Sequence, residues 1–300
     1  MNRVRIAPEV ADALHHRRPV VALETTLVAH GFPDGRGVEV ARASERRVRE
    51  AGAVPATIGV VDGAVRVGLA DDELELFAAA GADARKVGPR DLAAAVVQGA
   101  LGATTVGATL AVCRTAGIGF MGTGGLGGVH RGFPAPPDVS ADLGELARVE
   151  VLVVSSGVKS LLDVSATAEV LETLGVPVLG WRTDTIPRFY TAGGGPPISA
   201  RVETADEAAR IARSHWEFGR RSALVLARPP SESLDDVEPL IEQALADARA
   251  EGVSGQGVTP FVLARLHERS GGRTIEVNAQ LIADNAALAA EVAVAYARLA

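Results

Sequence analysis

The sequence alternates short apolar runs with longer stretches of helical periodicity, and this alternation constrains the fold more than any other feature. The apolar runs are four to six residues long, rich in β-branched residues and bounded by glycine, proline or charge, as buried strands usually are. They predict strands at residues 19–23, 56–61, 118–121, 149–154, 176–179 and 223–227. Helices are expected at residues 38–50, 90–101, 105–115, 140–148, 159–174, 205–218, 237–251, 261–270 and 278–299.

The order of these elements indicates an α/β protein with helices on both faces of a sheet. Asp62-Gly63 separates the run at 56–61 from another at 64–68, and this pair is a strong signal for a two-residue hairpin. The glycine- and proline-rich stretches at 191–197 and 228–231 look like surface loops and not like a domain linker. We therefore expect a three-layer α/β/α fold with a mixed central sheet, in a single domain over residues 1–300.

Composition narrows the classes of partner. The 30 basic and 37 acidic residues give a net charge of −7, which argues against a nucleic-acid backbone or an anionic membrane as the main partner. The single cysteine, Cys113, excludes a disulfide framework within the chain and a zinc-thiolate cluster. The N-terminus has no apolar signal region and no long uninterrupted apolar segment follows. We expect a soluble, cytoplasmic protein that acts on a small molecule.

A glycine-rich loop at 122–132 follows the predicted strand at 118–121 and formally matches G-x-G-x-x-G. The dinucleotide fingerprint also needs a helix that begins in the loop and an acidic residue after the next strand, and prolines at 134, 136 and 137 prevent that helix. The loop is then either a flexible surface loop or backbone that presents N–H groups to an anion. The neighbouring donors Thr123, His130 and Arg131 favour a phosphate.

Two ionisable residues follow predicted strands, where α/β folds collect their ligands. Glu24 ends the first strand, and partial burial there would raise its pKa toward the range of a general acid; a solvated strand end is the alternative. Lys159 follows the strand at 149–154 and suits either a nucleophile toward carbonyls or a point charge for phosphate. His30, six residues after Glu24, either flanks the same pocket or is structural.

Two further patterns have two interpretations each. Lys86 lies in a basic run before a predicted helix and is either solvated or part of a binding site. Asp138, Ser140 and Asp142 stand at alternating positions, and such hard oxygen ligands suit Mg²⁺ or Mn²⁺. Ser140 also suits a helix N-cap with Asp142 in the first turn.

Five motifs in this order resemble the pseudouridine-5'-phosphate glycosidase family, which shares its fold with indigoidine synthase A-like proteins. The resemblance covers essentially the whole chain, and the motifs are Glu24-Thr25-Thr26, residues 86–91, the loop at 122–132, residues 138–142 and Gly157-Val158-Lys159-Ser160. It implies reversible hydrolysis of the C–C glycosidic bond of pseudouridine 5'-phosphate to uracil and ribose 5-phosphate.

The resemblance also implies roles for individual residues. Glu24 matches the proton donor, Lys159 the nucleophile that forms a Schiff base with the ring-opened ribose, and Asp138 the ligand of one Mn²⁺ per subunit. Substrate-binding positions match Lys86, Val106, Ser140, Ala141 and Asp142, with Thr105, Thr123 and His130 near the phosphate and Asn278 at the uracil edge. The family is typically homotrimeric.

Two other functions fit the same residues. Another sugar-phosphate enzyme, such as a Schiff-base lyase or an N-glycosidase, would use Lys159 and the glycine loop with a different base pocket. A non-catalytic nucleotide-binding protein would need the loop but not Glu24 and Lys159 together.

Overall fold

The computed structural model describes residues 3–132, 138–253 and 255–299, and within them eleven strands form one sheet. The prolines at 134, 136 and 137 lie outside the described residues. The sheet order is β1-β4-β3-β2-β7-β9-β13-β11-β12, and β6 joins β5 to β3. The strands are β1 (Val4–Ile6), β2 (Val20–Glu24), β3 (Val54–Val61), β4 (Ala64–Val67), β5 (Arg85–Val87), β6 (Gly102–Thr104), β7 (Phe120–Gly122), β9 (Leu152–Ser155), β11 (Val178–Trp181), β12 (Ala200–Val202) and β13 (Leu224–Ala227).

The sheet is mixed, as the hairpin signal predicted. Strands from β2 through β7, β9, β13, β11 and β12 run parallel, whereas β3 pairs antiparallel with β4 and β6. Asp62 and Gly63 both have positive φ, 49° and 70°, which is the backbone of the primed turn that suits a two-residue hairpin. A small separate ladder pairs β8 (Val129–His130) with β10 (Leu162–Asp163).

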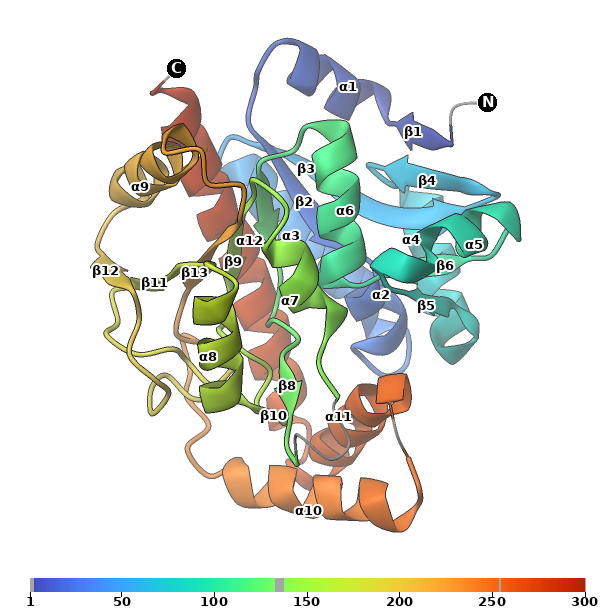
Figure 1. Cartoon of the computed structure of the whole chain (residues 1–300). Helices are drawn as coiled ribbons and strands as arrows, with labels where there is room; N and C mark the ends of the chain where they lie inside the picture. Colours follow the sequence, from blue (N-terminus) through green and yellow to red (C-terminus); the bar gives the residue numbers. More distant parts are fainter. Residues whose placement is uncertain (1–2, 133–137, 254, 300) are drawn as a thin grey trace.

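Helices cover both faces of the sheet (Figure 1). Along β2, Val21 and Leu23 pack in one cluster with α9 and α12, whereas Val20 and Ala22 pack with α6 in another. This alternation gives three layers and confirms the expected α/β/α fold. The helices are α1 (Pro8–His15), α2 (Thr26–His30), α3 (Arg36–Glu50), α4 (Asp71–Ala80), α5 (Leu92–Val97), α6 (Val106–Ala116), α7 (Ala141–Leu146), α8 (Val164–Thr173), α9 (Ala205–Glu217), α10 (Glu238–Ala250), α11 (Val258–Arg269) and α12 (Arg273–Ala297).

The helix predicted at 159–174 begins later than expected. Residues 162 and 163 pair with β8, and Asp163 then caps α8 by accepting a hydrogen bond of 2.9 Å from the amide of Ala166. The prediction was wrong at this end because the pairing with β8, far away in sequence, competes with helix formation. As a result Lys159 lies in a loop between β9 and β10.

The helix predicted at 90–101 ends at Val97, where Gly99 with φ 63° turns the chain toward β6. The sequence patterns did not predict β1, β5, β6 and β12, which have three residues each and are too short to show an alternating pattern. They also missed α1, α2 and α4. No helix within the described ranges combines the length and apolar character needed to cross a bilayer.

Candidate active site

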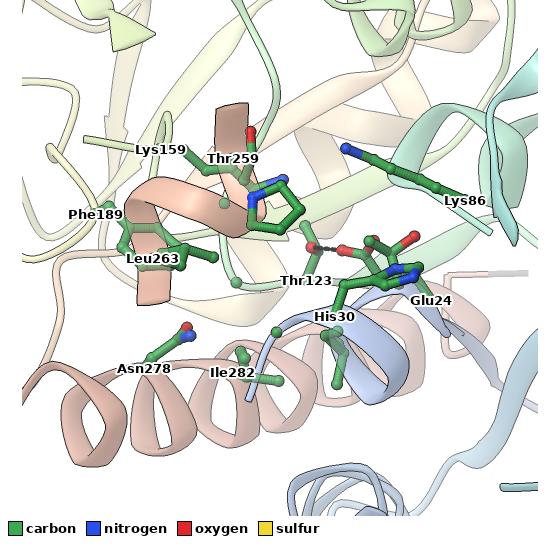
Figure 2. A pocket seen from close by; sticks show the side chains of 16 residues that line it. Glu24, His30, Lys86, Thr123, Lys159, Phe189, Thr259, Leu263, Asn278 and Ile282 are labelled. Atoms are coloured by element: carbon green, nitrogen blue, oxygen red, sulfur yellow. Dashed lines mark hydrogen bonds between the residues drawn. The ribbon is translucent and has the colours of Figure 1, made fainter. Parts of the chain in front are cut away.

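The parallel strands β2, β7 and β9 are neighbours, so the residues after their carboxyl ends meet at one edge of the sheet. A cavity with two lobes opens there. Residues that line both lobes form its waist: Glu24, Thr26, Lys86, Lys159 and Thr259. Figure 2 shows Glu24 and Lys86 on one side of this cavity and Lys159 on the other.

Glu24 is the last residue of β2 and only 5% exposed. The hydroxyl of Thr123, the first residue after β7, donates a hydrogen bond of 2.5 Å to its Oε1. Burial raises the pKa of Glu24, and the charge of Lys159 and the Thr123 hydrogen bond only partly oppose this. A carboxyl group in this setting retains its proton at higher pH than usual and suits a general acid.

Lys86 reaches the waist from β5, which β6 connects to the central sheet. Burial and then the nearby positive charge of Lys159 lower the pKa of Lys86, while the carboxylates of Asp142, Glu24 and Asp138 oppose the change. The two amines and the carboxyl group of Glu24 therefore lie close enough for their charges to interact. Lys159 itself is half-buried, and its backbone amide donates to the carbonyl of Leu126 at 3.1 Å.

The polar lobe contains most of the expected substrate-binding residues. It is lined by the waist residues together with Thr105, His130, Asp138, Ser140, Ala141 and Asp142. Ser140 caps α7 by accepting from the amide of Asp142 at 3.2 Å. Both carboxylate oxygens of Asp142 accept from backbone amides, at 2.8 Å from Gly107 and 3.0 Å from Gly127. Ser140 and Asp142 therefore fit the capping interpretation.

Val106 follows Thr105 but does not itself line the cavity. It is the first residue of α6, and its side chain is 1% exposed and packs in the hydrophobic core. Amides in the first turn of a helix have no intrahelical partner. Only the backbone of Val106, not its side chain, is thus suited to contact a substrate.

Asp138 is the carboxylate in this lobe that fits a metal best. Its side chain is 36% exposed and its Oδ2 lies 3.7 Å from Nδ1 of His130, whose pKa is lowered by burial. The described residues contain no group of three or more His, Cys, Asp or Glu side chains placed to hold a metal together. A hard cation that keeps most of its waters needs only one or two carboxylates, so Asp138 fits a water-rich site.

The glycine loop is packed internally and differs from the expected phosphate cradle. Amides of Thr123, Leu126, Gly127, Val129 and His130 already donate to acceptors within the protein. The glycines instead permit close contacts: a Cβ on Gly128 would lie 2.3 Å from Thr167, and one on Gly122 would lie 2.8 Å from Ala286. The loop is therefore not a loose surface segment, and these five amides are not available to an anion.

The second lobe has a mainly apolar lining surface, although several polar side chains reach it, and we call it the apolar lobe. Besides the waist residues it is lined by Thr123, Asn278, His30, Leu27, Phe189, Pro260, Leu263 and Ile282. Asn278 is 4% exposed, and its Oδ1 has no hydrogen-bond partner among the described residues. This acceptor suits the edge of a polar ring held among apolar walls. His30 lines the same lobe, and its Nε2 bonds to the carbonyl of Ala84 at 2.9 Å.

The structure therefore gathers the predicted site residues, apart from the side chain of Val106, at one cavity from both halves of the chain. The sequence patterns missed Phe189, Thr259, Leu263 and Ile282, because apolar residues and a lone threonine carry no chemical signal until the fold places them at a cavity.

Comparisons with known proteins agree with this architecture. The family model described as Indigoidine synthase A like protein matches residues 9–295. A protein of Deinococcus radiodurans named pseudouridine-5'-phosphate glycosidase is 48% identical over 298 residues, which cover 98% of this chain and 95% of the relative. The Escherichia coli protein of the same name is 44% identical over 301 residues, covering 99% and 96%.

Two solved structures are similar over nearly the whole chain. The prealnumycin C-glycosynthase in complex with ribulose 5-phosphate has a TM-score of 0.89 and 39% identity, covering 99% of this chain and 97% of that one. An indigoidine synthase A-like protein of Thermotoga maritima has a TM-score of 0.86 and 37% identity, covering 98% and 97%. The chain thus belongs to the pseudouridine-5'-phosphate glycosidase family, among the indigoidine synthase A-like proteins.

Proposed function

We propose that this protein is an enzyme that hydrolyses the C–C glycosidic bond of pseudouridine 5'-phosphate to uracil and ribose 5-phosphate, reversibly. The observation that carries the proposal is the two-lobed cavity with Glu24 and Lys159 at its waist. Relatives that are 44% and 48% identical over the full chain bear the name of this activity.

The two lobes suit the two ends of this substrate. Uracil is placed in the apolar lobe, where Asn278 offers a buried acceptor to its edge. The ribose then lies at the waist and the phosphate in the polar lobe, near Lys86, Thr105 and His130. The amide of Val106, at the start of α6 directly after Thr105, is a further candidate donor. In this placement the carbon that links sugar and base lies between Glu24 and Lys159.

The first chemical step opens the ribose ring. A C–C glycosidic bond has no heteroatom leaving group to protonate, so the two-carboxylate scheme of ordinary glycosidases does not apply. Glu24 donates its proton to the ring oxygen O4' as the C1'–O4' bond breaks, and the base supplies the electron pair through its ring. Lys159, as the free amine, then forms a bond to C1'.

The second step releases uracil. The amine nitrogen supplies an electron pair to form the C1'=N iminium with Lys159, the C1'–C5 bond breaks, and C5 of uracil receives a proton returned through Glu24. Water adds to the iminium, which frees Lys159 and gives the aldehyde of ribose 5-phosphate. The overall reaction consumes one water molecule per pseudouridine 5'-phosphate and gives one uracil and one ribose 5-phosphate.

We further propose that Mn²⁺ binds at Asp138 through water molecules and, when bound, supplies positive charge beside the phosphate. Asp142 does not share this role, because both its oxygens accept backbone hydrogen bonds. By the same resemblance we propose a cytoplasmic homotrimer that acts on this small molecule and not on nucleic acid.

Uracil release is the direct test. The protein is incubated with pseudouridine 5'-phosphate or uridine 5'-phosphate, with Mn²⁺ or with chelator, and free uracil is quantified by chromatography. We expect release from the C-nucleotide only, lost in chelator and restored by Mn²⁺. Release from uridine 5'-phosphate would instead indicate an N-glycosidase. Binding without turnover of either would indicate a nucleotide-binding protein.

A further inference from the structure

Phe189 lies in the loop after β11 and has an unusual backbone. Its φ is 62°, in the left-handed region that residues other than glycine rarely adopt. Such a conformation is energetically costly and persists only where the surroundings determine it. Here the amide of Phe189 donates to the carbonyl of Ser156 at 3.0 Å, just after β9. The backbone is therefore held in place by the same strand end that leads to Lys159.

The aromatic ring of Phe189 is fixed from two sides. It packs edge-on against Tyr190, with ring centroids 4.7 Å apart and an interplanar angle of 89°. On the other side it occupies the space above Gly125, where a Cβ would lie 2.5 Å from Cδ2 of Phe189 and 3.5 Å from Cγ of Lys159. The ring of Phe189 and the aliphatic part of Lys159 thus both pack against Gly125 of the glycine loop. Figure 2 shows the two residues on the same side of the pocket.

This ring forms one wall of a small compartment. The apolar lobe has a volume of about 70 Å³, against about 390 Å³ for the polar lobe. Leu263 and Ile282 line it together with Phe189. A wall whose backbone and ring are both constrained resists moving aside for a larger group, so an oversized ring in this lobe is bound more weakly.

We propose that Phe189 determines the size of the aglycone, limiting the apolar lobe to a single unfused pyrimidine ring. The proposal rests on the proposed function, because it takes uracil as the group that enters this lobe. Shortening the side chain opens the lobe beside Lys159, so a fused ring is admitted while uracil is held less firmly.

The test compares uracil with its benzo-fused analogue quinazoline-2,4-dione, each titrated into the enzyme without ribose 5-phosphate while the heat of binding is recorded. Binding is measured and not chemistry, so electronic effects of the fused ring on bond cleavage do not enter. We expect the unaltered enzyme to bind uracil at least about tenfold more tightly than the analogue. Phe189→Ala is expected to reduce or reverse that ratio, and Phe189→Leu to give an intermediate ratio.

Tyr190→Phe is the matched control, because it removes a buried hydroxyl without a partner among the described residues and leaves both rings in place. Its ratio is expected to equal that of the unaltered enzyme. Thermal unfolding of each variant shows whether it is folded. If Phe189→Ala does not fold, Phe189→Leu is used in its place. An unchanged ratio in a folded Phe189 variant overturns the proposal.

Gly125→Ala provides an independent arm. Its new Cβ would push on the ring of Phe189, so uracil should bind more weakly, and adding Phe189→Ala should relieve the defect. An equal defect of Gly125→Ala in both backgrounds would show that the ring is not the wall. If the unaltered enzyme releases no uracil from pseudouridine 5'-phosphate, the proposed function fails instead, which is a separate result.

Discussion

Glu24 is a carboxyl group almost fully removed from water, held by one hydroxyl and faced by two lysines. Burial disfavours its charged form, so its pKa is raised although Thr123 and Lys159 favour the charge. The same waist lowers the pKa of Lys86. The raised pKa of Glu24 lies in the direction that a proton donor near neutral pH requires, and perturbed groups of this kind gather at functional sites.

Thr123→Val tests the pKa of Glu24. The lost hydrogen bond favoured the ionised carboxylate, so its removal raises the pKa further. Activity that needs protonated Glu24 is lost as pH rises through that pKa, so the alkaline limb of the kcat profile is expected to move to higher pH. The rate at neutral pH should change by less than about tenfold, since one such bond contributes about 1 kcal/mol.

The pH profile is measured by uracil release, with Thr115→Val on the exposed face of α6 as control. An alkaline limb that stays in place or moves to lower pH would contradict the role of Glu24 as the acid.

Lys159→Arg and Lys159→Ala test covalent catalysis. Arginine keeps the positive charge but cannot form an imine, so both variants are expected to lose at least about a thousandfold in kcat, as removal of a nucleophile does. Ribose 5-phosphate with borohydride should add one reduced pentose phosphate to the Lys159 peptide of the unaltered enzyme, detected by mass spectrometry. An adduct on Lys86 would show that the two lysines have exchanged roles, and an active Lys159→Arg would exclude the Schiff base.

At the scale of elements, α12 fixes the ends of the central strands. Asn285 on this helix donates to the carbonyl of Thr123 at 2.8 Å and to the hydroxyl of Ser156 at 3.1 Å, which joins the segments after β7 and β9. The helix approaches β7 so closely that Gly122 leaves no room for a side chain against the backbone of Ala286. The segments that follow β7 and β9 are thereby held in register by one largely buried helix.

Gly122→Ala is expected to lower the free energy of unfolding by about 1–3 kcal/mol, because its Cβ would meet the Cα of Ala286 at 2.8 Å. Gly119→Ala, just before the same strand, has nothing within 4 Å of its added Cβ and is expected to be neutral or slightly stabilising. Urea denaturation of both variants measures the difference. Equal stabilities would mean that α12 moves aside without cost.

At the scale of the whole molecule, the cavity joins elements that lie at opposite ends of the chain. The apolar lobe takes walls from α2, α11 and α12, and the polar lobe takes β5 and the N-termini of α6 and α7. The substrate proposed for this site must engage both lobes at once for its reacting carbon to lie at the waist. Alignment by remote groups lowers the entropic part of the barrier.

Removing the phosphate should therefore impair catalysis at the waist. Unphosphorylated pseudouridine is expected to have a kcat/KM at least about a hundredfold lower, since each charge-assisted bond contributes about 1.5–3 kcal/mol. Steady-state uracil release from the nucleoside and the nucleotide gives the ratio. Equal rates would show that the polar lobe binds something other than the phosphate.

The sequence by itself determined the layered α/β architecture and the succession of the central strands and helices along the chain, through its periodicity. It also determined the hairpin at Asp62-Gly63, through its turn residues. These follow from local patterns, since side chains alternate along strands and recur along helices wherever one face is buried. Glu24 and Lys159 could also be predicted from the sequence. Each lies at or shortly after the end of a strand, in a fold that collects ligands at strand ends. The single-domain organisation stays a prediction.

Only the tertiary structure decided what the glycine loop does, which residues form the apolar lobe and which groups have shifted pKa values. Gly125 and Phe189 meet across more than sixty positions of the chain, and β5 is joined to the sheet by its pairing with β6, which pairs with β3. Close packing, burial and charge depend on such non-local contacts, because desolvation is set by every atom that surrounds a group and not by its neighbours in sequence.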